Sequence, residues 1–383
     1  MSNNNSEYVF AISVEDLQHE ENEKLDRELT EAEIEIAKKG LECGLLTGID
    51  SVYGAIFNEM IPNDHRKSRL NHLSKNILLL VTIIFLAFYF FACTGYSVNM
   101  GIKSYTAINE DNDSLKYYIG TEDGSAGKSK LLVLVQGSGR ESISRRFGWG
   151  AEAAMFGYDV LYLEKYAYDD SLKFLNTDCR ERRMKDISFA INDVAKNVYG
   201  NNLTEICLFA DSEGGVLAPE LANEIALIKR ILILGNGGLS GVEKINILFD
   251  KEKKYNYNGY LTKSGIKSKD DLDILLKEIK DNPDTEKYFL GNTYKYWNSY
   301  IYYDIDNYYE KLKIPTLVIM GENDFSVPCE SALYLKEKFK KNNLFTVEII
   351  PDADHFFVNS KGEKQFNNVL KTIIYPWFKR TSN

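Results

Sequence analysis

Short apolar runs recur throughout the part of the chain that follows residue 103, and polar or amphipathic stretches separate them. Apolar runs of this length, bounded by turn residues, are typical of buried strands. The pattern predicts two early strands within 105–119 and further strands at 131–135, 158–163, 205–209, 230–234, 315–320 and 345–350. Helical patterns lie between most of them, as over 183–198. Such alternation predicts an α/β fold with a doubly wound, mostly parallel sheet.

One apolar run differs from these in its length. Residues 77–96 are apolar on every helical face and cover about 20 residues, the length of a membrane-spanning helix. Positive charges are frequent in 61–76, whereas Lys103 is the one close positive charge after the run. By the positive-inside bias, we expect a single-pass transmembrane helix or signal anchor at 77–96, a basic juxtamembrane linker at 61–76 and an extracytoplasmic catalytic part. The alternative is a buried core helix.

The N-terminal region allows a second interpretation. Residues 1–60 form an acidic segment in which Thr30 and Glu33 have the spacing of a capping box, so a small helical module is expected. Met60 could instead be the true start, which would make 60–92 a signal segment and Cys93 a lipidated cysteine. Phe90 and Phe91 suit that signal poorly. Both interpretations place the C-terminal part outside the cytoplasmic membrane and tethered to it.

The most informative motif surrounds Ser212. It follows the predicted strand at 205–209 and precedes a helical stretch that begins at Val216. A strand, a sharp turn with serine and a helix form a nucleophile elbow, in which the residues two before and two after the serine must be small. Ala210 and Gly214 occupy those positions. Ser212 is therefore a candidate nucleophile.

A serine nucleophile needs a base and an orienting acid. The chain has four histidines, of which His355 alone lies after the apolar run at 77–96, in a loop that follows the predicted strand 345–350. Asp324 follows the predicted strand 315–320. The order Ser, Asp, His is that of α/β hydrolases and differs from the chymotrypsin and subtilisin orders.

These motifs resemble the α/β-hydrolase superfamily over about residues 103–383, in particular its single-domain esterases and serine aminopeptidase-like members. The resemblance implies Ser212 as nucleophile, His355 as general base and acid, and Asp324 as orienting carboxylate. An oxyanion hole needs two backbone N–H groups. The first is expected from Glu213, and the second from Ser138 in the loop after the strand 131–135, with Gly139 as the alternative.

The carboxylates on either side of Ser212 are unusual beside a developing negative charge. Asp211 and Glu213 could select a cationic group, such as a peptide amino terminus, or could point into solvent, which is the preferred interpretation. Residues 240–310, which are rich in tyrosine, interrupt the strand–helix alternation and are expected to form a cap. Those tyrosines could line the substrate or could simply pack helices on the sheet.

Composition limits the other possibilities. The net charge of −10 argues against nucleic acid as a partner, because phosphate binding needs a basic surface. The five cysteines have no metal-ligand spacing, so neither a metal site nor a cofactor is expected. The sequence thus predicts a membrane-tethered serine hydrolase for an ester, thioester or amide, acting on a small molecule or a peptide. The alternatives are a serine aminopeptidase-like enzyme and a non-catalytic binding or sensing protein of the same fold.

Overall fold

A computed structural model describes residues 100–122, 128–255 and 259–381. The expected N-terminal segment at 1–60, the linker at 61–76, the membrane span at 77–96 and Cys93 all lie outside these residues. Within the described ranges, no helix combines the length and the apolar character needed to cross a bilayer.

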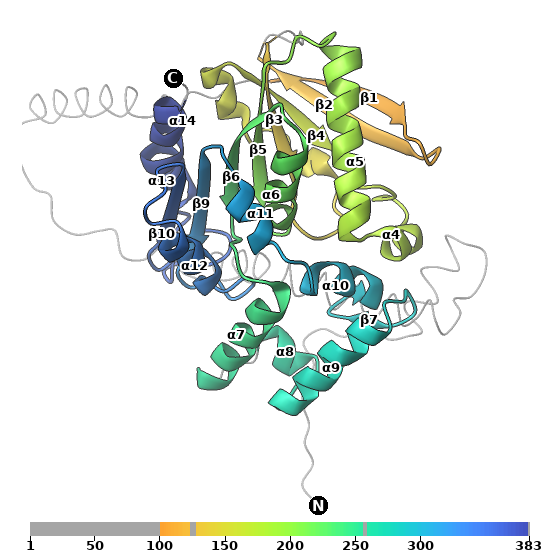
Figure 1. Ribbon diagram of the computed structural model, residues 1–383, viewed down its shortest axis with the longest axis vertical. Helices are drawn as coiled ribbons and strands as arrows, with labels where there is room; N and C mark the ends of the chain where they lie inside the picture. Colours follow the sequence, from red (N-terminus) through yellow and green to blue (C-terminus); the bar gives the residue numbers. More distant parts are fainter. Residues whose placement is uncertain (1–99, 123–127, 256–258, 382–383) are drawn as a thin grey trace, which may run out of the picture. The chain divides into compact units, whose positions relative to one another are not determined.

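The described residues form an eight-stranded, mostly parallel sheet (Figure 1). Its strands lie in the order β1-β2-β4-β3-β5-β6-β9-β10. They are β1 (Gly101–Ile108), β2 (Ser114–Thr121), β3 (Lys130–Val135), β4 (Tyr158–Leu163), β5 (Glu205–Asp211), β6 (Ile228–Leu234), β9 (Thr316–Gly321) and β10 (Phe345–Ile350). The pairs β1–β2 and β2–β4 are antiparallel, and the other neighbours are parallel. The predicted mostly parallel α/β sheet is confirmed.

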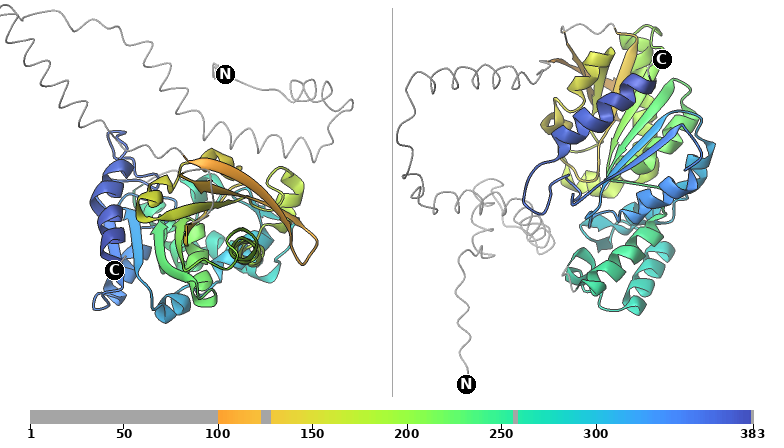
Figure 2. Two further views of the ribbon diagram at one scale, coloured as in Figure 1. Left: turned by 90° about the horizontal axis from the view of Figure 1, so that it is seen from above. Right: turned by 90° about the vertical axis from the view of Figure 1, so that its left-hand side faces the viewer.

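Helices cover both faces of this sheet, as the two views of Figure 2 show. One face packs against α5 (Arg180–Asp193), α6 (Gly214–Glu224) and α12 (Glu330–Lys338). The other face packs against the short helix η2 (Ala151–Phe156) and the C-terminal run α13 (Phe366–Val369), η4 (Leu370–Ile374) and α14 (Tyr375–Thr381). The inner strands are buried on both faces, which explains why their sequences read as continuous apolar runs.

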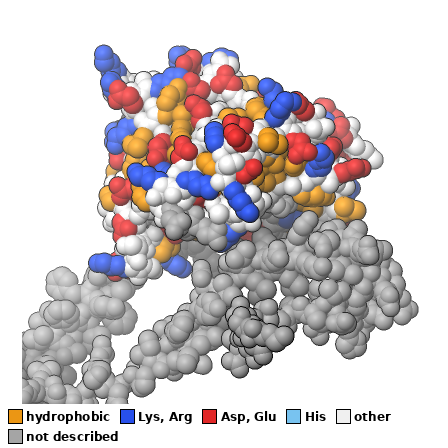
Figure 3. All heavy atoms as spheres, turned by 90° about the horizontal axis from the view of Figure 1, so that it is seen from below, with side chains coloured by type: hydrophobic (Ala, Val, Ile, Leu, Met, Phe, Trp, Pro, Cys, Tyr) orange, Lys and Arg blue, Asp and Glu red, His pale blue; other side chains and the backbone are white. Residues whose placement is uncertain are grey.

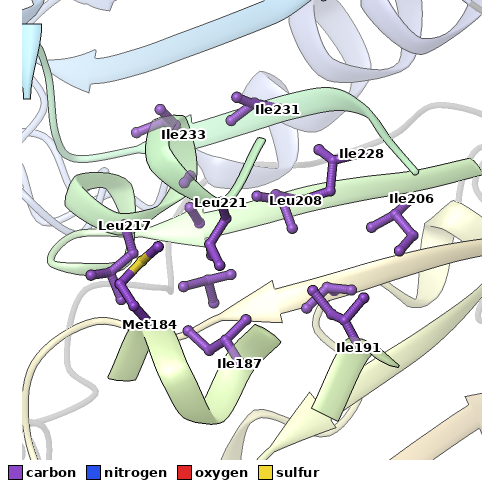
Figure 4. Packing of buried hydrophobic residues seen from close by; sticks show 14 of the residues in the cluster. Met184, Ile187, Ile191, Ile206, Leu208, Leu217, Leu221, Ile228, Ile231 and Ile233 are labelled. Atoms are coloured by element: carbon purple, nitrogen blue, oxygen red, sulfur yellow. The ribbon is translucent and has the colours of Figure 1, made fainter. Parts of the chain in front are cut away.

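Branched apolar side chains fill the space between the sheet and the first helical face. Figure 4 shows Met184, Ile187 and Ile191 of α5 turned toward Leu217 and Leu221 of α6 and toward side chains of β5 and β6. Their spacing of three and four residues places the α5 side chains on one helix face. This packing fixes α6 directly behind the end of β5, where Ser212 lies.

Between β6 and β9 the chain forms an insertion with its own apolar cluster. Its elements are α7 (Gly241–Lys254), α8 (Tyr260–Lys263), α9 (Lys269–Asp281), β7 (Tyr288–Phe289), β8 (Asn292–Thr293), α10 (Tyr294–Ile301) and α11 (Asp306–Lys311). Capping boxes start α7 at Ser240 and α9 at Ser268. Figure 1 shows α7 to α10 on the side of the sheet where β6 ends. The insertion falls where the sequence interrupts the alternation, and its function as a cap stays a prediction.

Candidate active site

The turn that carries Ser212 is tight, and its neighbours show why. Ser212 has a φ of 49°, a left-handed conformation that is costly for a residue with a side chain. Its N–H donates to Leu234 O at 2.8 Å, and its carbonyl oxygen accepts from Gly215 N–H at 2.9 Å. A Cβ on Gly214 would collide with the backbone carbonyl of Val135. The small residue two positions after the serine is therefore required by the close approach of β3.

The structure brings Ser212, His355 and Asp324 together in one hydrogen-bonded chain. His355 Nε2 lies 3.0 Å from Ser212 Oγ, and His355 Nδ1 lies 2.6 Å from Asp324 Oδ2. The three residues follow β5, β10 and β9, so the carboxyl edge of the sheet supplies all of them.

Asp324 is held in place by the backbone around it. The carboxylate is 1% exposed, and its Oδ1 accepts the N–H groups of Ser326 and Val327, each at 2.8 Å. These bonds leave Oδ2 for His355. An oxygen fixed in this way can hold the imidazole in the tautomer whose Nδ1 carries the proton.

Opposing effects set the pKa of His355. Burial of the ring lowers this pKa, whereas the hydrogen bond and charge of Asp324 raise it, with smaller contributions from Asp211 and Asp354. The net result is a pKa above its ordinary value. The imidazole is therefore more basic than a free histidine and better suited to take a proton from a hydroxyl.

Asn236, which follows β6, supports the turn from behind. Its Nδ2 donates to Ser212 O at 2.8 Å, and its Oδ1 accepts from Lys244 Nζ of α7 at 2.7 Å. Burial lowers the pKa of Lys244 to about 7, against a weaker opposing effect of Glu243. No sequence pattern predicts this pair, because an asparagine and a lysine in these contexts look like ordinary surface residues.

The expectation that Glu213 points to solvent or toward a cationic substrate is wrong. Its carboxylate is buried, forms an ion pair with the Arg183 guanidinium, and accepts hydrogen bonds from Tyr296 Oη and, at 2.9 Å, from Tyr300 Oη. Burial raises the pKa of Glu213, but nearby Lys165 and Arg183 and the two tyrosines outweigh it and hold the pKa below its ordinary value. The side chain of the residue after the serine thus faces the core.

Asp211 also has a protein partner. Its Oδ2 lies 3.3 Å from Arg146 Nη1, and the Arg146 guanidinium lies over the ring of Trp149. Burial raises the pKa of Asp211, although the charges of Arg146 and His355 oppose this. Both carboxylates that flank Ser212 are therefore engaged within the chain.

The loop after β3 lies next to the serine. A Cβ added to Gly137 would be 3.1 Å from Ser212 Cβ, so the loop that contains Ser138 borders the turn. Within the described residues, no hydrogen bond engages the backbone N–H groups of Ser138 and Glu213. Gly139 has a φ of 92°, and no atom lies within 4 Å of the position that a Cβ on this residue would occupy. The assignment of the oxyanion donors to Ser138 and Glu213 stays a prediction.

Comparison with known proteins adds a family match over part of the chain. The model of the dienelactone hydrolase family matches residues 302–375, a stretch that includes Asp324 and His355. No curated protein matches the chain with significance.

Solved structures with a similar arrangement include two esterases and a peptidase. An esterase of Pyrococcus furiosus is 18% identical, with 76% of this chain and 91% of that chain covered and a TM-score of 0.45. The esterase Est1E of Butyrivibrio proteoclasticus is 16% identical, with 73% and 99% covered and a TM-score of 0.49. An acylaminoacyl peptidase of Pyrococcus horikoshii is 14% identical, with 78% and 43% covered and a TM-score of 0.49. The family match over residues 302–375 confirms the resemblance of this chain to the α/β-hydrolase superfamily.

Proposed function

We propose that the protein is a serine hydrolase that cleaves a carboxylic ester, thioester or amide through an acyl-enzyme on Ser212. The observation that carries the proposal is the continuous chain from Ser212 Oγ through His355 to the buried Asp324, at 3.0 and 2.6 Å. A serine, a histidine and a buried aspartate that are hydrogen-bonded in this order are typical of a catalytic triad. The match of residues 302–375 to a hydrolase family supports the same reaction class.

The reaction follows from this geometry. Ser212 Oγ attacks the substrate carbonyl carbon as its proton passes to His355 Nε2, and Asp324 stabilises the imidazolium through Nδ1–H. The N–H of Glu213 and an N–H of the 136–139 loop stabilise the oxyanion. The protonated His355 then donates to the leaving oxygen, sulfur or nitrogen. Water, activated by the neutral His355, hydrolyses the acyl-enzyme and restores Ser212.

Cleavage of an ester or thioester is a better expectation than removal of amino-terminal residues. One argument for a peptidase is that the carboxylates beside the serine could select a cationic group, yet Glu213 is paired with Arg183 and Asp211 with Arg146. Neither is left to bind a substrate ammonium. Activated short-chain esters and amino-acid arylamides, assayed side by side, distinguish the two specificities.

The proposed partner is a small-molecule or peptide substrate, and the proposed location is a membrane-tethered domain outside the cytoplasm. The tether rests on the apolar run at 77–96 and the charges before it. On the described part of the face shown in Figure 3, acidic and basic side chains are intermixed. This distribution gives no support to a nucleic-acid partner.

Labelling with a fluorophosphonate probe tests the proposal. The full chain should be labelled covalently, and Ser212→Ala should lose all labelling and about 10⁶-fold in kcat. Ser268→Ala, which removes the capping serine of α9, is the matched control and should be labelled like the wild type. A folded wild-type protein without labelling or turnover would favour the non-catalytic binding protein instead.

A further inference from the structure

Arg183 connects the two backbone segments that carry the expected oxyanion donors. It lies on α5 and is buried. Its guanidinium forms an ion pair with the carboxylate of Glu213, whose own N–H is the first donor. The same guanidinium donates from Nη2 to Gln136 O at 2.6 Å and from Nη1 to Gly137 O at 3.5 Å. One side chain therefore contacts both halves of the hole.

These contacts fix the direction of the loop N–H groups. In a trans peptide the carbonyl and the following N–H point in opposite directions, and the described residues contain no cis peptide. Because Arg183 binds the carbonyls of Gln136 and Gly137, the N–H groups of Gly137 and Ser138 point to the other side of the loop. The loop borders Ser212, with Gly137 against it. Arg183 thus fixes the side of the loop on which these N–H groups lie.

The surroundings of Glu213 complete the arrangement. Lys165 Nζ lies 3.8 Å from its carboxylate, and the hydroxyls of Tyr296 and Tyr300 donate to it from α10. The Glu213 carboxylate thus has two cationic and two hydroxyl partners, which together hold it beside Arg183. The planar guanidinium fork holds a carboxylate and two carbonyls in one fixed geometry, whereas the three donors of an ammonium rotate and share no fixed plane.

We propose that Arg183, locked by the Glu213 carboxylate, is a positioning residue that sets the two oxyanion donors relative to each other. This inference rests on the proposed serine hydrolase activity. A buried ion pair adds little net stability compared with apolar side chains of the same volume. Its location at this loop therefore favours a positioning function over a purely stabilising one.

Arg183→Met tests the inference in the full chain. It removes the fork while keeping much of the buried volume, and it should lower kcat on an activated ester by about 10-fold to 100-fold, with KM changed less than about 3-fold. The rate of fluorophosphonate labelling should fall with kcat. Arg183→Lys keeps the charge beside Glu213 without the fork. If the methionine variant fails to fold, the lysine variant carries the test, with an expected loss of about 10-fold.

Arg182→Met is the matched control on the same helix. Arg182 also forms ion pairs, with Asp113 and Asp186, and lies over Tyr166. Within the described residues, its side-chain hydrogen bonds and ion pairs do not reach the loop at 136–139 or Glu213. The Arg182→Met variant should be less stable than the wild type but should have the same kcat per labelled active site. Folded Arg183 variants with the kcat of this control would overturn the positioning function and leave the serine hydrolase intact. Absent labelling of the wild type would overturn both.

Discussion

Substitution of Gly235, the residue that follows β6, disturbs the candidate active site directly while Ser212, His355 and Asp324 themselves stay unchanged. The φ of Gly235 is 65°, and a Cβ built on it would lie 2.9 Å from Cε1 and 3.3 Å from Nδ1 of His355. Ordinary van der Waals contact to a Cβ begins at 3.4 Å. In Gly235→Ala the imidazole must therefore move by about half an ångström, or the backbone must move instead.

Two separate costs follow from this substitution. A left-handed φ costs an alanine about 1 kcal/mol, which lowers the melting temperature by about 2–4 °C in a domain of this size. Displacement of the ring lengthens the 3.0 Å bond to Ser212 and turns it out of line. Misplacement of a catalytic group by a fraction of an ångström to one ångström reduces the rate by about 10-fold to 100-fold, and we expect a loss of kcat/KM in that range.

Gly265→Ala separates the two costs. Gly265 also has a positive φ, 91°, and nothing lies within 4 Å of an added Cβ. Both variants should lose similar stability, measured by thermal unfolding, but only Gly235→Ala should lose ester hydrolysis and fluorophosphonate labelling. Wild-type activity in a folded Gly235→Ala protein would refute the reasoning that His355 works at its present distance from Ser212.

Three further predictions test other contacts. Because neutral His355 is the base and its pKa is raised, kcat/KM of the wild type should fall as the pH drops through a midpoint above 6.5. Asp324→Asn should lower the pKa of His355, measured by NMR titration, and should lower kcat by about 10⁴-fold. Asn236→Ala should destabilise the protein by about 1 kcal/mol in urea unfolding and reduce kcat, since Ser212 O loses its bond; unchanged values would contradict that support. Burial raises the pKa of Cys207, so it should react with a thiol reagent only after unfolding, and rapid labelling of native Cys207 would contradict its place in β5.

The parts of the fold that the sequence could predict are those in which one local pattern decides the outcome. The prediction for 158–163 matches the bounds of β4, because this buried inner strand is a nearly continuous apolar run. The prediction for 345–350 matches the bounds of β10, a half-buried edge strand in which apolar and polar residues are mixed. The elbow was visible because a tight turn at Ser212 excludes large neighbours. Strand burial and a tight turn each restrict the residue types within a short segment, so a sequence motif can indicate them.

The side chains behind the elbow could not be predicted, since their partners are far away in sequence. Arg183 and Glu213 are separated by 30 positions, and Tyr300 and Glu213 by 87. A glutamate beside a nucleophile looks like a surface residue unless its partners are known. The tyrosine-rich composition of the insertion is the one sequence feature that points to these contacts. In the structure, the hydroxyls of Tyr296 and Tyr300 donate to the Glu213 carboxylate.

The same contacts bear on what the insertion does. If the insertion were only a cap over the active site, its removal would not affect the residues that pack around Glu213. Here α10 places two hydroxyls on the Glu213 carboxylate, and the backbone at Ile301 packs against Gly241 at the start of α7. Loss of the two hydroxyls alone would leave the buried carboxylate without two of its hydrogen bonds, which costs about 1–3 kcal/mol for each lost partner. The insertion is therefore part of the support for the elbow, whatever it also contributes to the binding of a substrate.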